Sequence, residues 1–279
     1  MRVENLSVGG MRIAVGTWCP GEYGVPNWSL KPIQRRRHVV YGNRDQKRLA
    51  SGLRYALSDI GVQKAYAPKT FPPSGKIADI RSLTERIFLN SDIEMRRGKN
   101  PTDGIPIGVG DGFMASLGGC PFIIGTADRK AVVAHAALKS MIHPDVVMGR
   151  KNLEEEPGIV KTIINWFGER GVPAEEVSLC MLLAIPAMAY KRQFDHPTFG
   201  AYNTALWELV SRKWPSGATR RGGNMFINLE SLFLEQAREG GVRNAETMFS
   251  LAEFPDLPHT YNVKWHQDMR YLAVIKRCS

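Results

Sequence analysis

The chain has 279 residues, of which 43% are hydrophobic, 9% aromatic and 23% charged. These values are ordinary for a globular protein and exclude a disordered or fibrous one. The length allows one large domain or two modest ones, and we expect a single domain over residues 1–279. Basic residues exceed acidic ones by ten, which favours an anionic partner such as phosphate, although an ordinary solvated surface gives the same excess.

The cysteines indicate the compartment. Cys19, Cys120, Cys180 and Cys278 lie far apart and form no CxxC pair, which argues against a zinc ribbon and a disulfide scaffold. No run of 18 apolar residues occurs, and the first twenty residues lack the apolar stretch of a signal peptide. The sequence therefore predicts a cytoplasmic protein with reduced thiols and no membrane partner.

The first third of the chain predicts strands followed by helices. Residues 11–41 are typical of short strands and loops, and a helix should run from a cap at Asn43 to a stop at Gly61. The apolar spacing of residues 80–89 predicts a second helix. Residues 98–112 are rich in glycine and proline and are the best candidate for an internal linker.

The remaining elements define the fold class. The apolar segments 122–124 and 132–134 flank the polar turn 128–130, a pattern that predicts a β-hairpin. Helices are expected at residues 157–170, 201–214 and 229–238, a buried strand at 180–185 and a closing strand at 271–275. Because strands and helices interleave, we expect an α/β protein with mixed sheets.

Cys120 and His135 are the candidate catalytic residues. Two glycines precede Cys120, which begins the first strand of the hairpin, and His135 ends the second strand. Pairing about the turn brings these two strand ends together. An imidazolium next to a thiol stabilises the thiolate, which is both the nucleophile and the metal ligand. A cysteine at a strand start is otherwise an ordinary core residue.

The segment LGGCPFIIGTADRKAVVAHAAL, residues 117–138, resembles a signature of one structural superfamily. This superfamily contains the YfiH-type laccase-domain proteins, the CheD-type chemotaxis deamidases and the deamidase domain of cytotoxic necrotizing factor toxins. Further segments are similar to YfiH motifs, namely Asn43-Arg44 with Leu49-Ala50, Gly110 to Ala115, His135 to Leu138, Ala184 to Ala187, Asn228-Leu229 with Gly240 to Val242, and Tyr261-Asn262 with Met269-Arg270.

The YfiH resemblance implies a layered α/β/β/α fold and a zinc-dependent enzyme of purine nucleosides. It implies phosphorolysis or adenosine deamination, with nucleoside and phosphate as small-molecule partners and no nucleic acid. The zinc ligands of the family are one cysteine and two histidines, and Cys120 and His135 match two of them. No histidine lies between His38 and Cys120, so the other histidine of the family is missing and His38 is the candidate substitute.

Two alternatives remain open at this point. In a second register Thr126 to Arg129 matches the family's TADC, which places Arg129 where the cysteine should be and leaves the site inactive. The CheD resemblance instead implies a metal-free protein-glutamine deamidase with Cys120 as nucleophile and His135 as base. The auxiliary threonine of that family is replaced here by Met114. A degenerate relative that binds without catalysis is the third hypothesis.

One other segment combines aromatic and basic residues. Residues 213–223, with Trp214 among lysine, arginine and glycine, suit stacking on a base, and an exposed connecting loop is the plainer interpretation.

Overall fold

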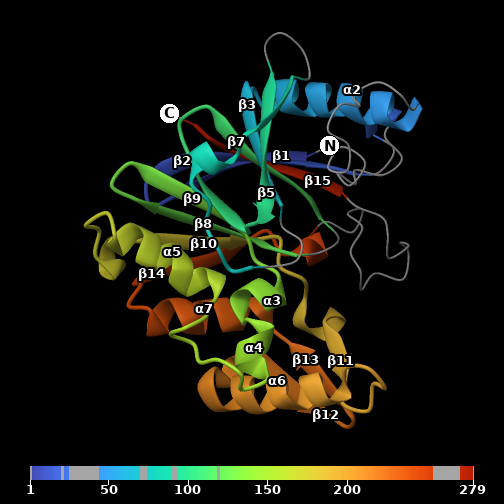
Figure 1. Cartoon of the computed structure of the whole chain (residues 1–279), viewed down its shortest axis with the longest axis vertical. Coiled ribbons are helices and arrows are strands. Elements are labelled where there is room, and N and C mark those ends of the chain that lie inside the picture. Colours follow the sequence, from blue (N-terminus) through green and yellow to red (C-terminus); the bar gives the residue numbers. More distant parts are fainter. Residues whose placement is uncertain are drawn as a thin grey trace.

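The computed structural model describes residues 2–19, 22–24, 44–69, 74–88, 93–117, 120–253 and 271–278. In this part of the chain three β-sheets and six α-helices form a layered α/β structure (Figure 1). The fold class expected from the sequence is confirmed.

The largest sheet has seven strands in the order β1-β2-β15-β7-β3-β5-β4. It is mixed, because β3 pairs in parallel with both β5 and β7 whereas the other neighbours are antiparallel. Its strands are β1 (Arg2–Val8), β2 (Met11–Trp18), β3 (Lys64–Lys69), β4 (Glu85–Phe88), β5 (Glu94–Pro101), β7 (Asp111–Leu117) and β15 (Tyr271–Arg277).

Helix α2 (Arg44–Asp59) covers the outer face of this sheet. Its apolar face carries Leu49, Leu53 and Leu57, which recur every four residues and are buried. They pack against Trp18 and Met114 of the sheet. The helix predicted from this spacing is confirmed, and Gly61 has the positive φ of 68° that its stop requires.

The second sheet has five strands in the order β14-β10-β8-β9-β6. Strands β8 (Phe122–Ala127) and β9 (Lys130–His135) form the predicted hairpin, with Asp128 and Arg129 in its turn. The other strands are β6 (Gly104–Ile107), β10 (Ser178–Leu182) and β14 (Asn244–Met248). Burial of every residue of β8 and β10 explains their continuous apolar sequence.

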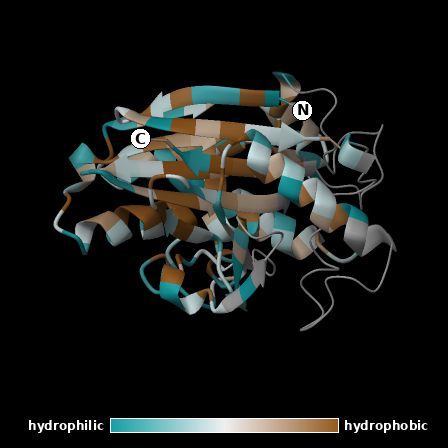
Figure 2. Ribbon diagram, turned by 90° about the horizontal axis from the view of Figure 1, so that it is seen from above, coloured by the Kyte–Doolittle hydropathy of each residue, from teal (hydrophilic) through white to brown (hydrophobic). Residues whose placement is uncertain are grey.

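The two large sheets face each other across the main core. Phe113 of β7 and Phe122 of β8 meet edge to face with ring centroids 5.5 Å apart. Helices α5 (Ile159–Gly168) and α7 (Leu229–Glu239) pack on the five-stranded sheet. Apolar segments accordingly dominate the strands in the interior (Figure 2). This order of helix, sheet, sheet and helices is the expected α/β/β/α layering.

The remaining elements form a smaller layer beyond α7 (Figure 1). They are α3 (Leu138–Met141), α4 (Pro144–Val147), α6 (Gly200–Lys213) and a three-stranded antiparallel sheet of order β11-β13-β12. Its strands are β11 (Lys191–Gln193), β12 (Ala218–Arg221) and β13 (Asn224–Ile227). No helix in the described ranges has the length and apolarity needed to cross a membrane.

The helix predicted over residues 80–89 is wrong. Only a short 3-10 helix forms at Ile80–Ser82, and residues 85–88 are the edge strand β4. Strand β4 pairs antiparallel with β5, and both Arg86 and Arg96 form ion pairs with Glu94. The apolar spacing of these residues fits a helix as well as a strand, and pairing with β5 favours the strand.

The linker predicted over residues 98–112 is wrong as well. Apart from short turns, these residues belong to β5, β6 and β7. Pro106 is tolerated because β6 is the edge strand of its sheet. Gly104 is required by close packing, since a Cβ there would lie 2.9 Å from the Cβ of Ala134. The segment therefore connects the two large sheets.

Candidate functional site

Three neighbouring strands bring three polar residues to one edge of the five-stranded sheet. Cys120 lies two residues before β8, His135 ends β9, and Asp103 directly precedes β6. Phe122 pairs with His135 across β8 and β9, and the amide of Ala136 donates to the carbonyl of Pro121 at 2.8 Å. The strand register of this hairpin is thus the one that the predicted approach of Cys120 to His135 requires.

Asp103 is the residue that sequence reasoning missed. The register of β6 on β9 places it beside His135, whose amide donates to the carbonyl of Asp103 at 2.8 Å. The side chains meet too, with His135 Nδ1 3.1 Å from Asp103 Oδ1. Nothing local in the sequence marks Asp103, because its role arises from pairing with a strand about thirty residues away.

The carboxylate of Asp103 is fully buried and rigidly held. Its Oδ2 accepts hydrogen bonds from the amides of Ser74 at 2.6 Å and Gly75 at 2.7 Å, and from the Ser74 hydroxyl at 3.2 Å. With His135 on Oδ1, both oxygens have donors, as a buried charge requires. This network fixes the imidazole through Nδ1 and leaves the other ring nitrogen for the hydrogen bond with Cys120.

The surroundings of His135 favour its protonated form. Burial alone would lower the pKa of this almost fully buried imidazole, but the charge of a Cys120 thiolate and the hydrogen bonds to Asp103 and Cys120 outweigh it. Together they raise the pKa of His135 to about 10. The site therefore holds a thiol, an imidazole and a carboxylate in series, which is the arrangement of a thiol nucleophile with its base and orienting group.

The four cysteines differ in exposure. Cys120 is partly exposed, whereas Cys180 in β10 is fully buried. Burial, with a smaller contribution from Glu246, raises the pKa of the Cys180 thiol to about 12. Cys180 is therefore an inert core residue, and the contrast identifies Cys120 as the one of these two thiols that is placed for chemistry.

The competing residues from the sequence do not join this site. Arg129 lies exposed in the hairpin turn, at the end of the strands opposite His135, so the register that puts it in the cysteine's place gives no site. Met114 is fully buried in the core beneath α2. Trp214, expected in a loop, is 3% exposed. His38, the candidate third zinc ligand, lies outside the described residues.

The side chains at this site include two donors that zinc accepts. A thiolate and an imidazole are zinc ligands, and a carboxylate on the second ring nitrogen is the usual outer partner of a metal-bound histidine. However, no three of the His, Cys, Asp and Glu side chains within the described ranges gather as a metal site. The described residues supply two donors and do not fit a three-ligand zinc centre.

Comparison with known proteins gives the fold. No protein-family model and no curated protein matches the sequence. The structure is similar to YfiH of Bacillus licheniformis, with a TM-score of 0.61, 11% identity and coverage of 95% of this chain and 91% of that one. The chain has the YfiH-type fold.

Two further solved structures agree with the YfiH-type fold. YlmD of Geobacillus stearothermophilus has a TM-score of 0.64 at 13% identity, with 96% of this chain and 92% of that chain covered. A Neisseria meningitidis protein of the DUF152 family has a TM-score of 0.60 at 13% identity over the full length of both chains. The similarity spans nearly the whole chain, so both large sheets belong to this fold.

Proposed function

We propose that this chain is an enzyme whose reaction centre is Cys120 and His135, and that it acts on purine nucleosides. The observation that carries the proposal is the meeting of Cys120, His135 and Asp103 at one sheet edge, with a rigid bond from His135 Nδ1 to Asp103. Nucleosides are the substrate class that the resemblance of residues 117–138 to the YfiH-type proteins implies, and the net positive charge favours an anionic co-substrate such as phosphate.

The residues suggest how a proton moves in such a reaction. Phosphorolysis expels a purine base and deamination expels ammonia, and each leaving group needs a proton as its bond breaks. His135 is held protonated, because its pKa is raised to about 10, and since Nδ1 is held by Asp103 the proton that it gives up is the one on Nε2, on the side of Cys120. Asp103 keeps the imidazole oriented while the proton leaves. No step in this scheme depends on zinc.

The test is product analysis. Adenosine, inosine and guanosine are incubated with and without phosphate, and the free base, ribose 1-phosphate and deaminated nucleoside are measured by liquid chromatography. We expect turnover by the wild type and loss of at least about a hundredfold in Cys120→Ala and His135→Ala. Cys278→Ala, which removes a partly exposed thiol elsewhere, is the matched control. Nucleosides left intact by the wild type, or equal turnover by Cys120→Ala, contradict the proposal.

A second candidate is a metal-free thiol amidohydrolase, favoured by the completeness of the Cys120–His135–Asp103 series. The thiolate attacks a carboxamide carbon, His135 gives its proton to the departing ammonia, and water then hydrolyses the thioester with His135 as base. Ammonia release from glutamine-containing peptides, with a trapped thioester at Cys120, supports this alternative. Turnover of nucleosides without such a thioester supports the first proposal instead.

A further inference from the structure

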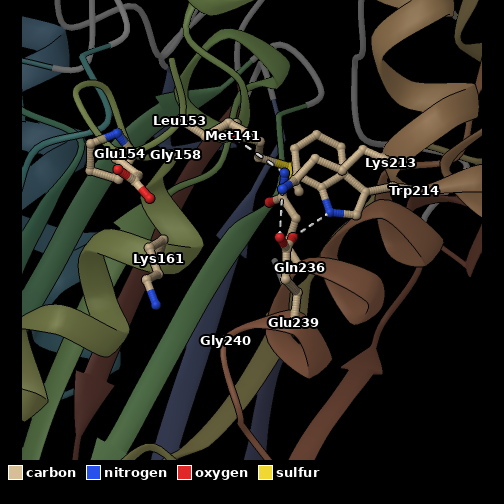
Figure 3. Close-up of a pocket in the computed structure, with 11 residues that line it drawn as sticks. Met141, Leu153, Glu154, Gly158, Lys161, Lys213, Trp214, Gln236, Glu239 and Gly240 are labelled. Atoms are coloured by element: carbon tan, nitrogen blue, oxygen red, sulfur yellow. Dashed lines mark hydrogen bonds and ion pairs between the residues drawn. The ribbon is translucent and has the colours of Figure 1, made fainter.

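A cleft lies between the start of α5 and the helix α7 (Figure 3). Its volume is about 250 Å³, and neither Cys120 nor His135 lines it. Lys161 projects on one side, and Lys213, Trp214 and Glu239 lie on the other. Pockets for drug-sized ligands usually begin at about 300 Å³, so this cleft suits a smaller molecule.

The first turn of α5 provides an anion subsite. Gly158 caps this ten-residue helix without a side-chain hydrogen bond. The amides of Ile159, Val160 and Lys161 have no acceptor among the described residues. A helix start with free amides attracts negative charge. The Lys161 ammonium is exposed and forms no ion pair with the described residues, so it adds a positive charge at the rim, where Glu154 and Glu239 also line the cleft.

Gln236 gives an independent indication of a ligand. This side chain of α7 is 9% exposed and lines the cleft. Its Nε2 donates to the carbonyl of Met141 at 3.3 Å, which leaves Oε1 as the acceptor of the amide. No donor among the described residues reaches this buried Oε1. Buried acceptors are almost always satisfied, so a ligand N–H is expected here.

The opposite wall is aromatic and electrically neutral. Trp214 Nε1 donates to Glu239 at 2.8 Å, and Lys213 Nζ lies 2.6 Å from the other oxygen of the same carboxylate. Lys213 is thus already compensated, and its partner Glu239 opposes a second anionic group on this side of the cleft. Only 3% of Trp214 is exposed and Lys213 Nζ lies 5.6 Å from its ring centroid, so the indole contributes an apolar edge to this wall and no open stacking face.

We propose that this cleft binds a small molecule that carries one anionic group and an N–H donor. The anion lies at the start of α5 beside Lys161, and the N–H donates to Gln236 Oε1. The inference is independent of the reaction at Cys120, because none of these residues belongs to that site.

Three small probes separate the parts of this proposal. Orotate has the carboxylate and N–H donors, uracil lacks the anion, and benzoate lacks the N–H. Calorimetric titrations use the Cys120→Ala protein, so binding at the catalytic thiol does not contribute. We expect orotate to bind about tenfold or more tightly than uracil and benzoate, because hydrogen bonds to charged groups and buried acceptors have this magnitude.

The matched variants are Lys161→Met and Lys191→Met, which each remove one exposed lysine. Lys161→Met should weaken orotate binding about tenfold, and Lys191→Met, on β11, should leave it unchanged. Orotate binding that is absent at about 1 mM, that equals binding of uracil or benzoate, or that survives Lys161→Met unchanged overturns the proposal.

Discussion

His135 and Asp103 are joined twice, by a backbone hydrogen bond of 2.8 Å and by a side-chain contact of 3.1 Å between Nδ1 and Oδ1. The backbone bond belongs to the pairing of β9 with β6, so sheet formation itself brings the carboxylate to the imidazole. The side-chain contact then fixes which ring nitrogen faces Asp103. The orientation of His135 is therefore a consequence of strand register, and substitutions can test it without moving the strands.

Asp103→Asn should impair catalysis more than folding of the sheet. The amide keeps the shape of the side chain but removes the charge that orients and stabilises the protonated His135, and outer partners of this kind are worth about ten- to a hundredfold in activity. The unfolding free energy should also fall by about 1–3 kcal/mol, because the amides of Ser74 and Gly75 lose a charged acceptor.

Turnover and urea denaturation measure these two effects. The matched control is Asp79→Asn, an exposed residue whose carboxylate accepts from the amide of Arg81. Its activity should equal that of the wild type. Equal activity of Asp103→Asn would show that Asp103 has no positioning role.

Cys120→Ser should lower the pKa of His135 from its value of about 10, because the negative charge of the thiolate raises it. A raised folded-state pKa stabilises the protein fully below about pH 6.5, and this contribution is lost as the pH rises through about 10. The histidine ring signals in nuclear magnetic resonance spectra, followed from about pH 6 to 11, report the titration.

Cys278→Ser is the control for that titration, since it changes a partly exposed thiol outside the site. It should leave the pKa of His135 where the wild type has it. An unaltered titration in Cys120→Ser would mean that the thiol and the imidazole do not interact.

Gly75→Ala should destabilise the network behind His135. Gly75 has a φ of 64°, and a Cβ there would lie 3.2 Å from the carbonyl oxygen of Pro157. Gly149 has a similar φ of 67° with open space around it, so Gly149→Ala isolates the backbone cost of about 1 kcal/mol. We expect Gly75→Ala to lose more unfolding free energy than Gly149→Ala and to reduce turnover as well. Equal losses would show that the contact with Pro157 is unimportant.

Arg129→Gly should stabilise the hairpin that carries the site. Asp128 and Arg129 have φ angles of 43° and 57°, a left-handed backbone that side chains disfavour and glycine accepts. The unfolding free energy should rise by about 0.5–1 kcal/mol in thermal or urea denaturation. Arg129→Ala removes the same exposed side chain but keeps the strained backbone, so it should be neutral. A gain of equal size in Arg129→Ala would assign the effect to the side chain instead.

The elements predicted correctly from the sequence are those in which a regular apolar pattern extends over many contiguous residues. Helices α2 and α5 carry 16 and 10 residues of regular apolar spacing, and the hairpin has two apolar strands about a polar turn. The pairing of Cys120 with His135 followed from the same local pattern. The strands β4 and β6 were missed because each is stabilised by pairing with another strand, β4 with β5 and β6 with β9. Such pairing leaves no pattern within the segment itself.

Asp103 shows the same limit within the site. Its segment, rich in glycine and proline, is typical of a loop, and only the parallel bridge of Ile77 to Gly104 and the pairing with β9 convert it into part of a sheet. A carboxylate that reaches its partner through strand pairing leaves no spacing for sequence analysis to detect. The YfiH-type resemblance of the hairpin was informative because its residues are contiguous.

The buried thiol of Cys180 reports how often the central sheet of the protein opens. The thiol is sealed at the centre of β10, between β8 and β14, and the raised pKa of about 12 keeps it protonated while the molecule is closed. An alkylating reagent can reach it only in molecules whose central sheet has come apart. The ratio of Cys180 to Cys120 modification, read by mass spectrometry on one sample, therefore compares how often the core opens with how reactive the surface thiol is.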